Sequence, residues 1–282
     1  MRPHRGSPHN EASSPAPQAP GSAGSEVIAA AFRGAVGRAA LMPYLMGGFP
    51  DAETSLRIGE ACADGGADLV ELGVPYSDPL ADGPVIHAAG TAALAAGTTT
   101  ADVLRVGREL SQRLPVVLMC YVNLVLARGP ERFAHDLAVH GIAGLIVPDL
   151  PLEESDPVLA ACDATGVALV PLVAPTTGEE RMAAIGARAR GFVYAVSLAG
   201  TTGERSGLSV DVAGVLRRAK AHTDVPVALG FGIGTPEQAA QAAAAGADGV
   251  IVGSRLVRAA ADGDDPAAAV GALVSAFARA LG

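Results

Sequence analysis

The chain has 282 residues, of which 50% are hydrophobic and 17% are charged. This length fits one or two domains, and the apolar content excludes a globally disordered protein. Twenty Lys and Arg against 29 Asp and Glu leave a net charge of −9, which is unlike the basic surface of a nucleic-acid binder. No apolar run approaches the roughly 18 residues of a membrane helix. Three scattered Cys without a CxxC pair favour neither a disulfide framework nor a zinc site. We therefore expect a cytoplasmic protein that binds neither nucleic acid nor membrane.

Residues 1–25 differ in composition from the rest of the chain. They are rich in Pro and Ser and contain no large apolar residue after Met1, so they cannot bury a core. They also lack the apolar centre of a signal peptide. The sequence predicts a disordered N-terminal tail over residues 1–25 and one catalytic domain over residues 26–282.

Apolar runs of strand length alternate with amphipathic segments of helix length along the whole domain. The runs are continuously apolar, which is typical of parallel strands covered on both faces. Eight such βα units in about 250 residues predict a TIM (β/α)8 barrel with an extra N-terminal helix. The alternative is a doubly wound open sheet, which usually carries a G-x-G-x-x-G turn that is missing here. The eight runs are 40–48, 67–75, 115–123, 142–150, 167–175, 191–199, 226–232 and 248–254, and the extra helix is 26–40.

Glu71 stands inside the second apolar run, after Leu69 and Val70. In a barrel this side chain points either into the interior or into the helix layer. Both surroundings are dry, so we expect the pKa of its carboxyl to be raised. A raised pKa suits general acid or base catalysis near neutral pH. The structural alternative is a buried carboxylate that a nearby Arg or Lys neutralises.

Asp78 and Asp82 follow in a segment that its prolines and Gly83 prevent from being helical. A loop after the strand brings a second carboxylate to the ligand that Glu71 contacts, and two carboxylates in different environments can divide the acid and base roles. The alternative is turn formation, since Ser-Asp-Pro and Ala-Asp-Gly are ordinary turn sequences.

The last three predicted strands run into glycine-rich loops. Gly203, Gly232 and Gly253 allow a ligand to approach the backbone closely. Helices that start at Thr235 and near Ser254 offer N–H groups to an anion. Because the loops after strands seven and eight of such barrels often bind phosphate, we expect a phosphorylated substrate. The alternative is that these glycines only permit tight turns.

The remaining polar residues give weaker signals. Tyr44, Tyr121 and Tyr194 lie within or at the end of predicted strands, where they line an aromatic-accepting pocket or pack in the core. The His residues of the predicted helices form no metal-ligand cluster. Neither a Walker A loop nor a nucleotide-binding G-x-G-x-x-G turn appears, so the residues predict no metal and no nucleotide cofactor.

The segment ELGVPYSDPLADGP at residues 71–84 closely resembles the signature of the tryptophan synthase alpha chain family. The stretches LMCYVN, GLIVPDLPLEE, LVAPTTGEER, GFVYAVSLAGTTG, GFGIGTPEQ and GSRLV resemble the family's other blocks, in the same order. The resemblance covers residues 26–282. One departure is Gly48-Phe49-Pro50, where the family usually has Gly-Asp-Pro, and another is Tyr44 at a position often held by Phe.

The resemblance implies a lyase that splits indole-3-glycerol phosphate into indole and glyceraldehyde 3-phosphate by a retro-aldol step, without a cofactor or metal. By position, Glu71 matches the acid–base glutamate and Asp82 matches the aspartate that faces the indole N–H. Thr202 matches the closing-loop threonine, and Asp78 lies in the loop that faces the partner subunit. The implied substrate-binding residues are Tyr44, Tyr121, Tyr194, Thr202, Gly203, Phe231, Gly232, Gly253 and Ser254.

The resemblance also implies a partner. The family pairs with a beta chain, as an alpha2-beta2 tetramer, and pyridoxal phosphate belongs to that beta chain. Two alternatives remain open at this point: a stand-alone lyase with the same site and no partner, and a non-catalytic barrel that binds a phosphate ligand and regulates a partner. The presence of both Glu71 and Asp82 favours an enzyme.

Overall fold

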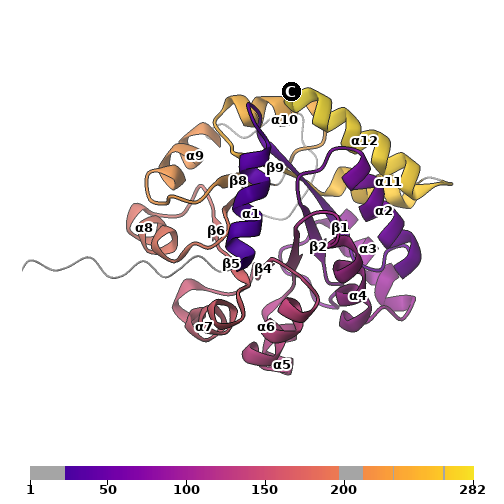
Figure 1. Ribbon diagram of the computed structural model, residues 1–282, viewed down its shortest axis with the longest axis horizontal. Helices are drawn as coiled ribbons and strands as arrows, with labels where there is room; N and C mark the ends of the chain where they lie inside the picture. Colours follow the sequence, from indigo (N-terminus) through magenta and orange to yellow (C-terminus); the bar gives the residue numbers. More distant parts are fainter. Residues whose placement is uncertain (1–22, 197–211, 231, 263) are drawn as a thin grey trace, which may run out of the picture.

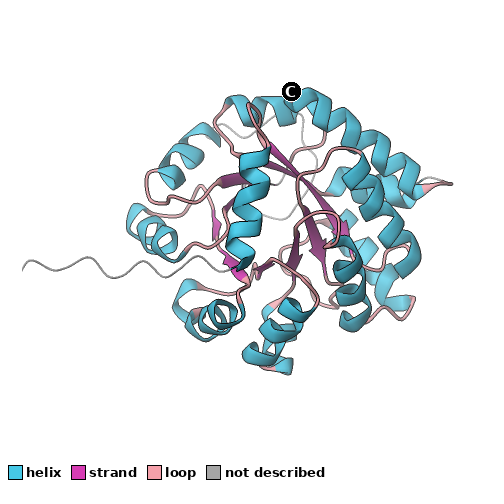
Figure 2. Cartoon of the chain, viewed as in Figure 1, coloured by secondary structure: helices cyan, strands magenta, loops and turns pink. Residues whose placement is uncertain are grey.

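The computed structural model describes residues 23–196, 212–230, 232–262 and 264–282. These residues form an inner barrel of parallel strands with helices around it (Figures 1 and 2). The strands are β1 Ala40–Met46, β2 Val70–Gly73, β3 Val116–Met119, β4 Gly144–Ile146, β5 Ala168–Val170, β6 Leu172–Val173, β7 Val193–Val196, β8 Val227–Gly230 and β9 Gly249–Val252.

The helices of the described residues follow the strands in turn. They are α1 Ala23–Gly34, α2 Ala52–Asp64, α3 Pro84–Ala95, α4 Thr100–Leu110, α5 Val122–Arg128, α6 Pro130–Val139, α7 Asp156–Thr165, α8 Glu179–Arg188, α9 Val212–Lys220, α10 Pro236–Ala244, α11 Ser254–Asp262 and α12 Pro266–Leu281, with a 3-10 turn η1 at Leu152–Glu154. Several start at side-chain caps, such as Asp51 before α2 and Thr99 before α4. Among these helices, none combines the length and the apolar character needed to cross a membrane.

The strands close into a ring. They pair in the order β5-β4-β3-β2-β1-β9-β8-β7-β6, and every pair is parallel. The outer members, β5 and β6, are separated along the chain by Pro171 alone, so the covalent chain joins the two ends of the sheet. Pro171 has no N–H to donate, but its carbonyl accepts a bond from Tyr194 N at 2.9 Å. The predicted TIM barrel is confirmed, with the fifth predicted run divided in two.

Two apolar layers lie on opposite sides of the strands. Side chains that alternate along each strand point in opposite directions, so one set fills the interior and the other packs under the helices. On β2 and just before it, Leu69 belongs to the inner set, while Val70 and Leu72 belong to the outer one. This alternation decides whether a residue of β2 faces the barrel interior or the helices.

Helix α1 covers one end of the barrel, where it crosses the strands in Figure 1. Its Ile28 and Phe32 belong to the inner apolar set. The helix spans Ala23–Gly34, so the predicted extra helix at 26–40 starts three residues earlier and ends six residues earlier than expected. The cause of the earlier start is a close backbone contact: Gly24 N donates to Gly166 O at 2.7 Å, and a Cβ on Gly24 would lie 2.0 Å from the Ala143 carbonyl oxygen. Residues 1–22 lie outside the described residues.

Candidate active site

Glu71 is on the inner face of β2, near its carboxyl end. Leu69, two residues earlier, belongs to the inner apolar set, and the period of two along a strand turns Glu71 the same way. The side chain is 1% exposed, and neither carboxylate oxygen has a hydrogen-bond partner within the described residues. Burial, and secondly the charge of Asp82, raise the pKa of Glu71 to about 8. The alternative of a neutralising Arg or Lys is therefore not found among the described residues.

Asp82 lies in the loop between β2 and α3, next to the ring of Tyr121. The Tyr121 hydroxyl accepts a hydrogen bond from Ala81 N at 3.0 Å, beside Asp82. Burial raises the pKa of the Asp82 carboxyl, while the nearby Tyr121 hydroxyl and His87 oppose this shift. Sequence reasoning gave His87 no role, but this exposed side chain lies close enough to Asp82 to lower the pKa of its carboxyl. The loop carries the second carboxylate to the mouth of the barrel.

Two tyrosines fit over glycines of the neighbouring strands. A Cβ on Gly73 of β2 would meet the Tyr44 hydroxyl at 2.2 Å, and a Cβ on Gly230 of β8 would meet the Tyr194 hydroxyl at 2.2 Å. Both rings are buried, and burial is the main reason why both hydroxyls have a pKa far above the ordinary value. The charge of a nearby Glu71 carboxylate raises both pKa values further. The tyrosines thus flank Glu71 inside the barrel.

An apolar wall continues from Tyr44 towards the helices. A small cluster of buried side chains joins β1 to α3 and α11, and it consists of Tyr44, Met46, Ile86, Ala89 and Val257. Part-buried Met119 of β3 packs against both this cluster and the interior apolar set. The Tyr44 ring therefore borders an apolar cluster that β1 shares with α3 and α11.

The carboxyl ends of β8 and β9 supply the glycines of the predicted phosphate site. Gly232 follows β8 with φ +81°, a left-handed conformation that glycine adopts without strain. Gly253 follows β9 directly, and α11 begins at the next residue, Ser254. The first N–H groups of α11 thus lie at the carboxyl end of the barrel, where an anion is favoured.

The start of α10 differs from the prediction for it. Thr235 and Gln238 form a capping box, in which the Gln238 side-chain oxygen accepts from Thr235 N at 3.2 Å and from Gly234 N at 2.7 Å. The Thr235 hydroxyl accepts from Gln238 N at 3.3 Å. These N–H groups are already bonded within the chain, so the expectation that α10 offers them to an anion is wrong. Of the two predicted helix starts, that of α11 remains.

Four of the predicted site residues remain to be placed. Thr202, Gly203 and Phe231 lie outside the described residues. Asp78 is described, and it is exposed on the loop between β2 and α3, where it accepts a bond from the Ser77 hydroxyl at 2.5 Å. Within the described part of the chain, no three His, Cys, Asp or Glu side chains gather in a possible metal site.

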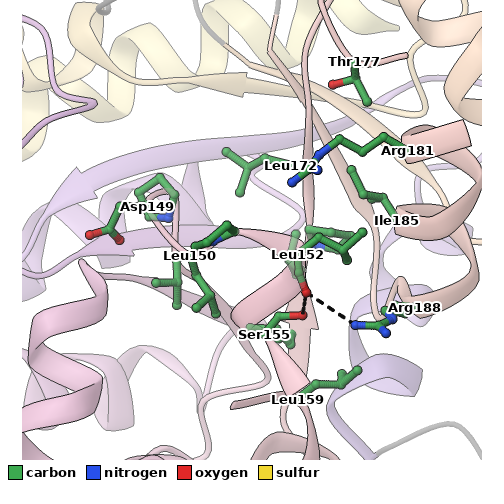
Figure 3. Close-up of a pocket in the computed structure, with 16 residues that line it drawn as sticks. Asp149, Leu150, Leu152, Ser155, Leu159, Leu172, Thr177, Arg181, Ile185 and Arg188 are labelled. Atoms are coloured by element: carbon green, nitrogen blue, oxygen red, sulfur yellow. Dashed lines mark hydrogen bonds between the residues drawn. The ribbon is translucent and has the colours of Figure 1, made fainter. Parts of the chain in front are cut away.

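A cavity of about 440 Å³ lies under the loop that follows β4, beside α7 and α8. Figure 3 shows Leu152 and Ile185 on its apolar wall, with Arg181 and Arg188 nearby. Arg181 is held by Glu153 through bonds of 2.5 and 2.9 Å. None of the predicted site residues that the structure describes lines this cavity, so it is separate from the site around Glu71.

Sequence reasoning missed Asp149, which lies three residues beyond β4. Its carboxylate accepts a bond from Val122 N at 2.8 Å, at the start of the short helix that follows Tyr121. The signal was present, because Asp149 is a polar residue in the loop after a predicted barrel strand, like Asp82.

The chain was compared with known proteins. A family model described as "Tryptophan synthase alpha chain" matches residues 32–280. The tryptophan synthase alpha chain of Prochlorococcus marinus (strain MIT 9313) is 52% identical over 226 residues, which are 79% of this chain and 82% of that protein.

Solved structures of the same family resemble the barrel closely. A chain of Mycobacterium tuberculosis tryptophan synthase has a TM-score of 0.84 and 40% identity, covering 93% of this chain and 99% of that one. A chain from the tryptophan synthase a2b2 complex of Pyrococcus furiosus has a TM-score of 0.80 and 34% identity, covering 85% of this chain and 98% of that one. The motif order, the barrel, the buried glutamate and these matches agree, and the chain belongs to the tryptophan synthase alpha chain family.

Proposed function

We propose that Glu71 and Asp82 are the two carboxylates with which this lyase cleaves indole-3-glycerol phosphate into indole and glyceraldehyde 3-phosphate. The observation that carries the proposal is the state of Glu71, which is buried, without a hydrogen-bond partner among the described residues, and has a pKa of about 8. A purely structural glutamate in a core is normally paired, because an unpaired buried polar group costs stability.

In the first step Glu71 acts as an acid. Its pKa of about 8 keeps it protonated at neutral pH, and it donates this proton to C3 of the indole ring. The ring nitrogen then carries positive charge, and the Asp82 carboxylate stabilises that charge by accepting a hydrogen bond from the ring N–H. The two carboxyl groups divide the work because their surroundings differ.

In the second step the carbon–carbon bond breaks. Glu71, now a carboxylate, accepts the proton of the side-chain hydroxyl next to C3. The electrons of that O–H bond form the aldehyde, and the electrons of the broken C–C bond return to the ring, which releases neutral indole. Glu71 ends the cycle protonated, so the reaction is balanced without an external acid, base, metal or cofactor.

The phosphate end of the substrate is assigned to the carboxyl ends of β8 and β9, which β1 separates from Glu71 on β2. The left-handed turn at Gly232 and the start of α11 at Gly253 and Ser254 support this assignment. Gly203 is proposed for the same group from the resemblance alone. Tyr44, Tyr121, Tyr194 and Phe231 are proposed to line the pocket for the indole and glycerol parts, with Thr202 positioning Asp82.

We further propose that the chain works in the cytoplasm with a tryptophan synthase beta chain, as an alpha2-beta2 tetramer. Pyridoxal phosphate would belong to that beta chain. Exposed Asp78 lies in a loop with Leu80, whose side chain is 80% exposed, and α5 exposes Leu126 by 58%. The stacked rings of Tyr76 and Tyr121 join this loop to α5, which supports a shared apolar docking surface.

An indole-release assay on indole-3-glycerol phosphate, with and without an added beta chain, tests these assignments. Slow release that rises strongly with the beta chain supports the synthase subunit. Fast release that the beta chain does not change supports a stand-alone lyase. Binding of the substrate without any release, in both conditions, overturns the catalytic assignment and supports a regulatory barrel.

A further inference from the structure

We infer that Asp149 is a positioning residue for Asp82 and that it acts through the start of helix α5 and the side chain of Tyr121. This inference rests on the proposed function, in which Asp82 faces the substrate. It concerns a residue that touches neither carboxylate of the proposed pair and lies on a different strand–helix loop. The chain of contacts that supports it has three links.

The first link joins Asp149 to α5. Helix α5 spans Val122–Arg128, and its preceding residue, Tyr121, makes no side-chain cap. Instead the Asp149 carboxylate, 27 residues further along the chain, accepts a hydrogen bond from Val122 N at 2.8 Å. A carboxylate at a helix start satisfies an unpaired N–H and complements the helix dipole.

The second link is the stiffness of the loop that presents Asp149. Strands β3 and β4 are neighbours, and Cys120 N continues their ladder by donating to Ile146 O at 3.0 Å. A turn follows, closed by Leu150 N donating to Val147 O at 3.2 Å. Asp149 is labelled in Figure 3 at the edge of the cavity that it lines together with Leu150 and Leu152. The backbone bonds on both sides of Asp149 fix the loop, and its carboxylate meets the start of α5 at Val122 N.

The third link joins Tyr121 to the catalytic loop. The backbone of Tyr121 precedes the bonded Val122 N–H, so a fixed helix start also fixes the direction of the Tyr121 side chain. Its hydroxyl accepts a hydrogen bond from Ala81 N at 3.0 Å, one residue before Asp82, and it lowers the pKa of the Asp82 carboxyl. The Tyr121 ring also stacks on the Tyr76 ring, with 5.1 Å between the ring centroids. Asp149 thus fixes the side chain that holds the loop at Ala81 and, with it, the position of Asp82.

Loss of Asp149 has a consequence that a general loss of stability does not have. Without its acceptor, the first turn of α5 loosens and the Tyr121 hydroxyl no longer holds Ala81 N beside Asp82. The nearby Tyr121 hydroxyl lowers the pKa of the Asp82 carboxyl, so its displacement raises that pKa. The acidic limb of the activity profile then moves to higher pH, because Asp82 must be ionised to act.

The experiment compares four variants of the full chain in the indole-release assay: Asp149→Ala, Asp149→Asn, Tyr121→Phe and the double variant Asp149→Ala/Tyr121→Phe. We expect Asp149→Ala to lower kcat by about 10- to 100-fold, with a smaller change in KM, and to shift the acidic limb upwards. Asp149→Asn keeps an acceptor oxygen and retains most of the activity. We expect the double variant to have the same kcat as Tyr121→Phe, because both changes interrupt the same series of contacts between Asp149 and Asp82.

Asp51→Ala is the matched control. Asp51 also accepts a bond from a backbone N–H near a helix start, Thr54 N at 2.8 Å, but it has no link to Tyr121. We expect Asp51→Ala to show the same dependence of indole release on pH as the wild-type protein. The inference is overturned if the double variant loses activity by the product of the two single losses, or if Asp149→Ala leaves the acidic limb unmoved.

A spectroscopic measurement separates failure of this inference from failure of the proposed function. The chain has no Trp and four Tyr, so its near-ultraviolet circular dichroism reports on tyrosine surroundings. We expect Asp149→Ala to change that signal, and to change it no further in the Tyr121→Phe background. If wild-type protein releases no indole but this pattern appears, the function is wrong and the positioning role stands. If the pattern is absent, the positioning role is wrong whatever the activity.

Discussion

Tyr44 and Glu71 lie directly opposite each other on neighbouring strands: their Cα atoms are register partners in β1 and β2. Both side chains are buried, at 6% and 1% exposure. The Tyr44 ring also covers Gly73, two residues after Glu71. The carboxyl of Glu71 is therefore enclosed by its own strand, by an aromatic ring and by the apolar interior. This enclosure is the larger physical cause of the raised pKa of Glu71, since charge is disfavoured in a dry site, and the charge of Asp82 is the second.

Replacing Glu71 by Gln should remove catalysis and leave ligand binding. The amide has nearly the same shape but donates no proton to C3, so we expect indole release to fall by about 10²- to 10⁴-fold. Calorimetry should show substrate binding within a few-fold of wild type. Glu131→Gln, an exposed change on α6, is the matched control and should keep full activity. Near wild-type turnover of Glu71→Gln would falsify the acid–base assignment.

Glu71→Gln should become more stable relative to the wild-type protein as the pH rises. Glu71 has a folded pKa of about 8 and an ordinary value of 4.5, so the folded state holds its proton over a range where the unfolded state has lost it. The protonated Glu71 therefore contributes its whole stabilisation of the wild-type protein below pH 4.5. Between pH 4.5 and about pH 8 the unfolding free energy falls by up to ~1.4 kcal/mol per pH unit, and above that range the contribution is lost.

Urea unfolding of wild type and Glu71→Gln at pH 5.5 and pH 8 measures this difference. We expect the variant's advantage in unfolding free energy to be larger at pH 8, because residue 71 no longer titrates. An advantage that is equal at both pH values would mean that Glu71 has an ordinary pKa.

Asp82→Asn should lower the pKa of Glu71. Burial is the larger cause of the raised value and the charge of Asp82 is the second, so neutralising Asp82 removes only the smaller part. We expect Glu71 to titrate below about 8 but still above 4.5. Carbon NMR of labelled Glu carboxyl groups checks the shift directly, and an unchanged titration would show that the two carboxylates do not interact.

Gly73→Ala should displace Tyr44 and destabilise the barrel mouth. The new Cβ would lie 2.2 Å from the Tyr44 hydroxyl and 2.7 Å from ring carbon Cζ. Such overpacking costs about 1–3 kcal/mol of unfolding free energy. Adding Tyr44→Phe removes the nearest atom but not the ring, so we expect partial recovery in thermal unfolding. Gly34→Ala, where no atom lies within 4 Å, is the control. Equal losses in both glycine variants would contradict a specific clash with Tyr44.

The barrel and its proposed catalytic pair could be predicted from the order of the residues. Continuous apolar runs separated by amphipathic segments determine a parallel sheet covered on both faces, because only such a sheet removes both sides of each strand from water. A carboxylate within one of these runs must be buried whichever way it faces. For this reason the raised pKa of Glu71 was predictable from Leu69, Val70 and Leu72 around it.

Other features depend on residues that are distant in the sequence. The capping box that occupies the start of α10 depends on how Gln238 turns back to Gly234, and a helix-start pattern alone does not reveal which N–H groups remain available. The fit of Tyr194 over Gly230 depends on the register of β7 against β8, which the barrel's closure sets. The sequence by itself determined the parallel strands of the barrel and the burial of Glu71, because hydrophobic periodicity is a local property. Only the tertiary structure decided which partners meet across strand ends. Those contacts depend on register and on the loop paths that bring Asp149 to the start of α5 and Tyr121 to Ala81, beside Asp82.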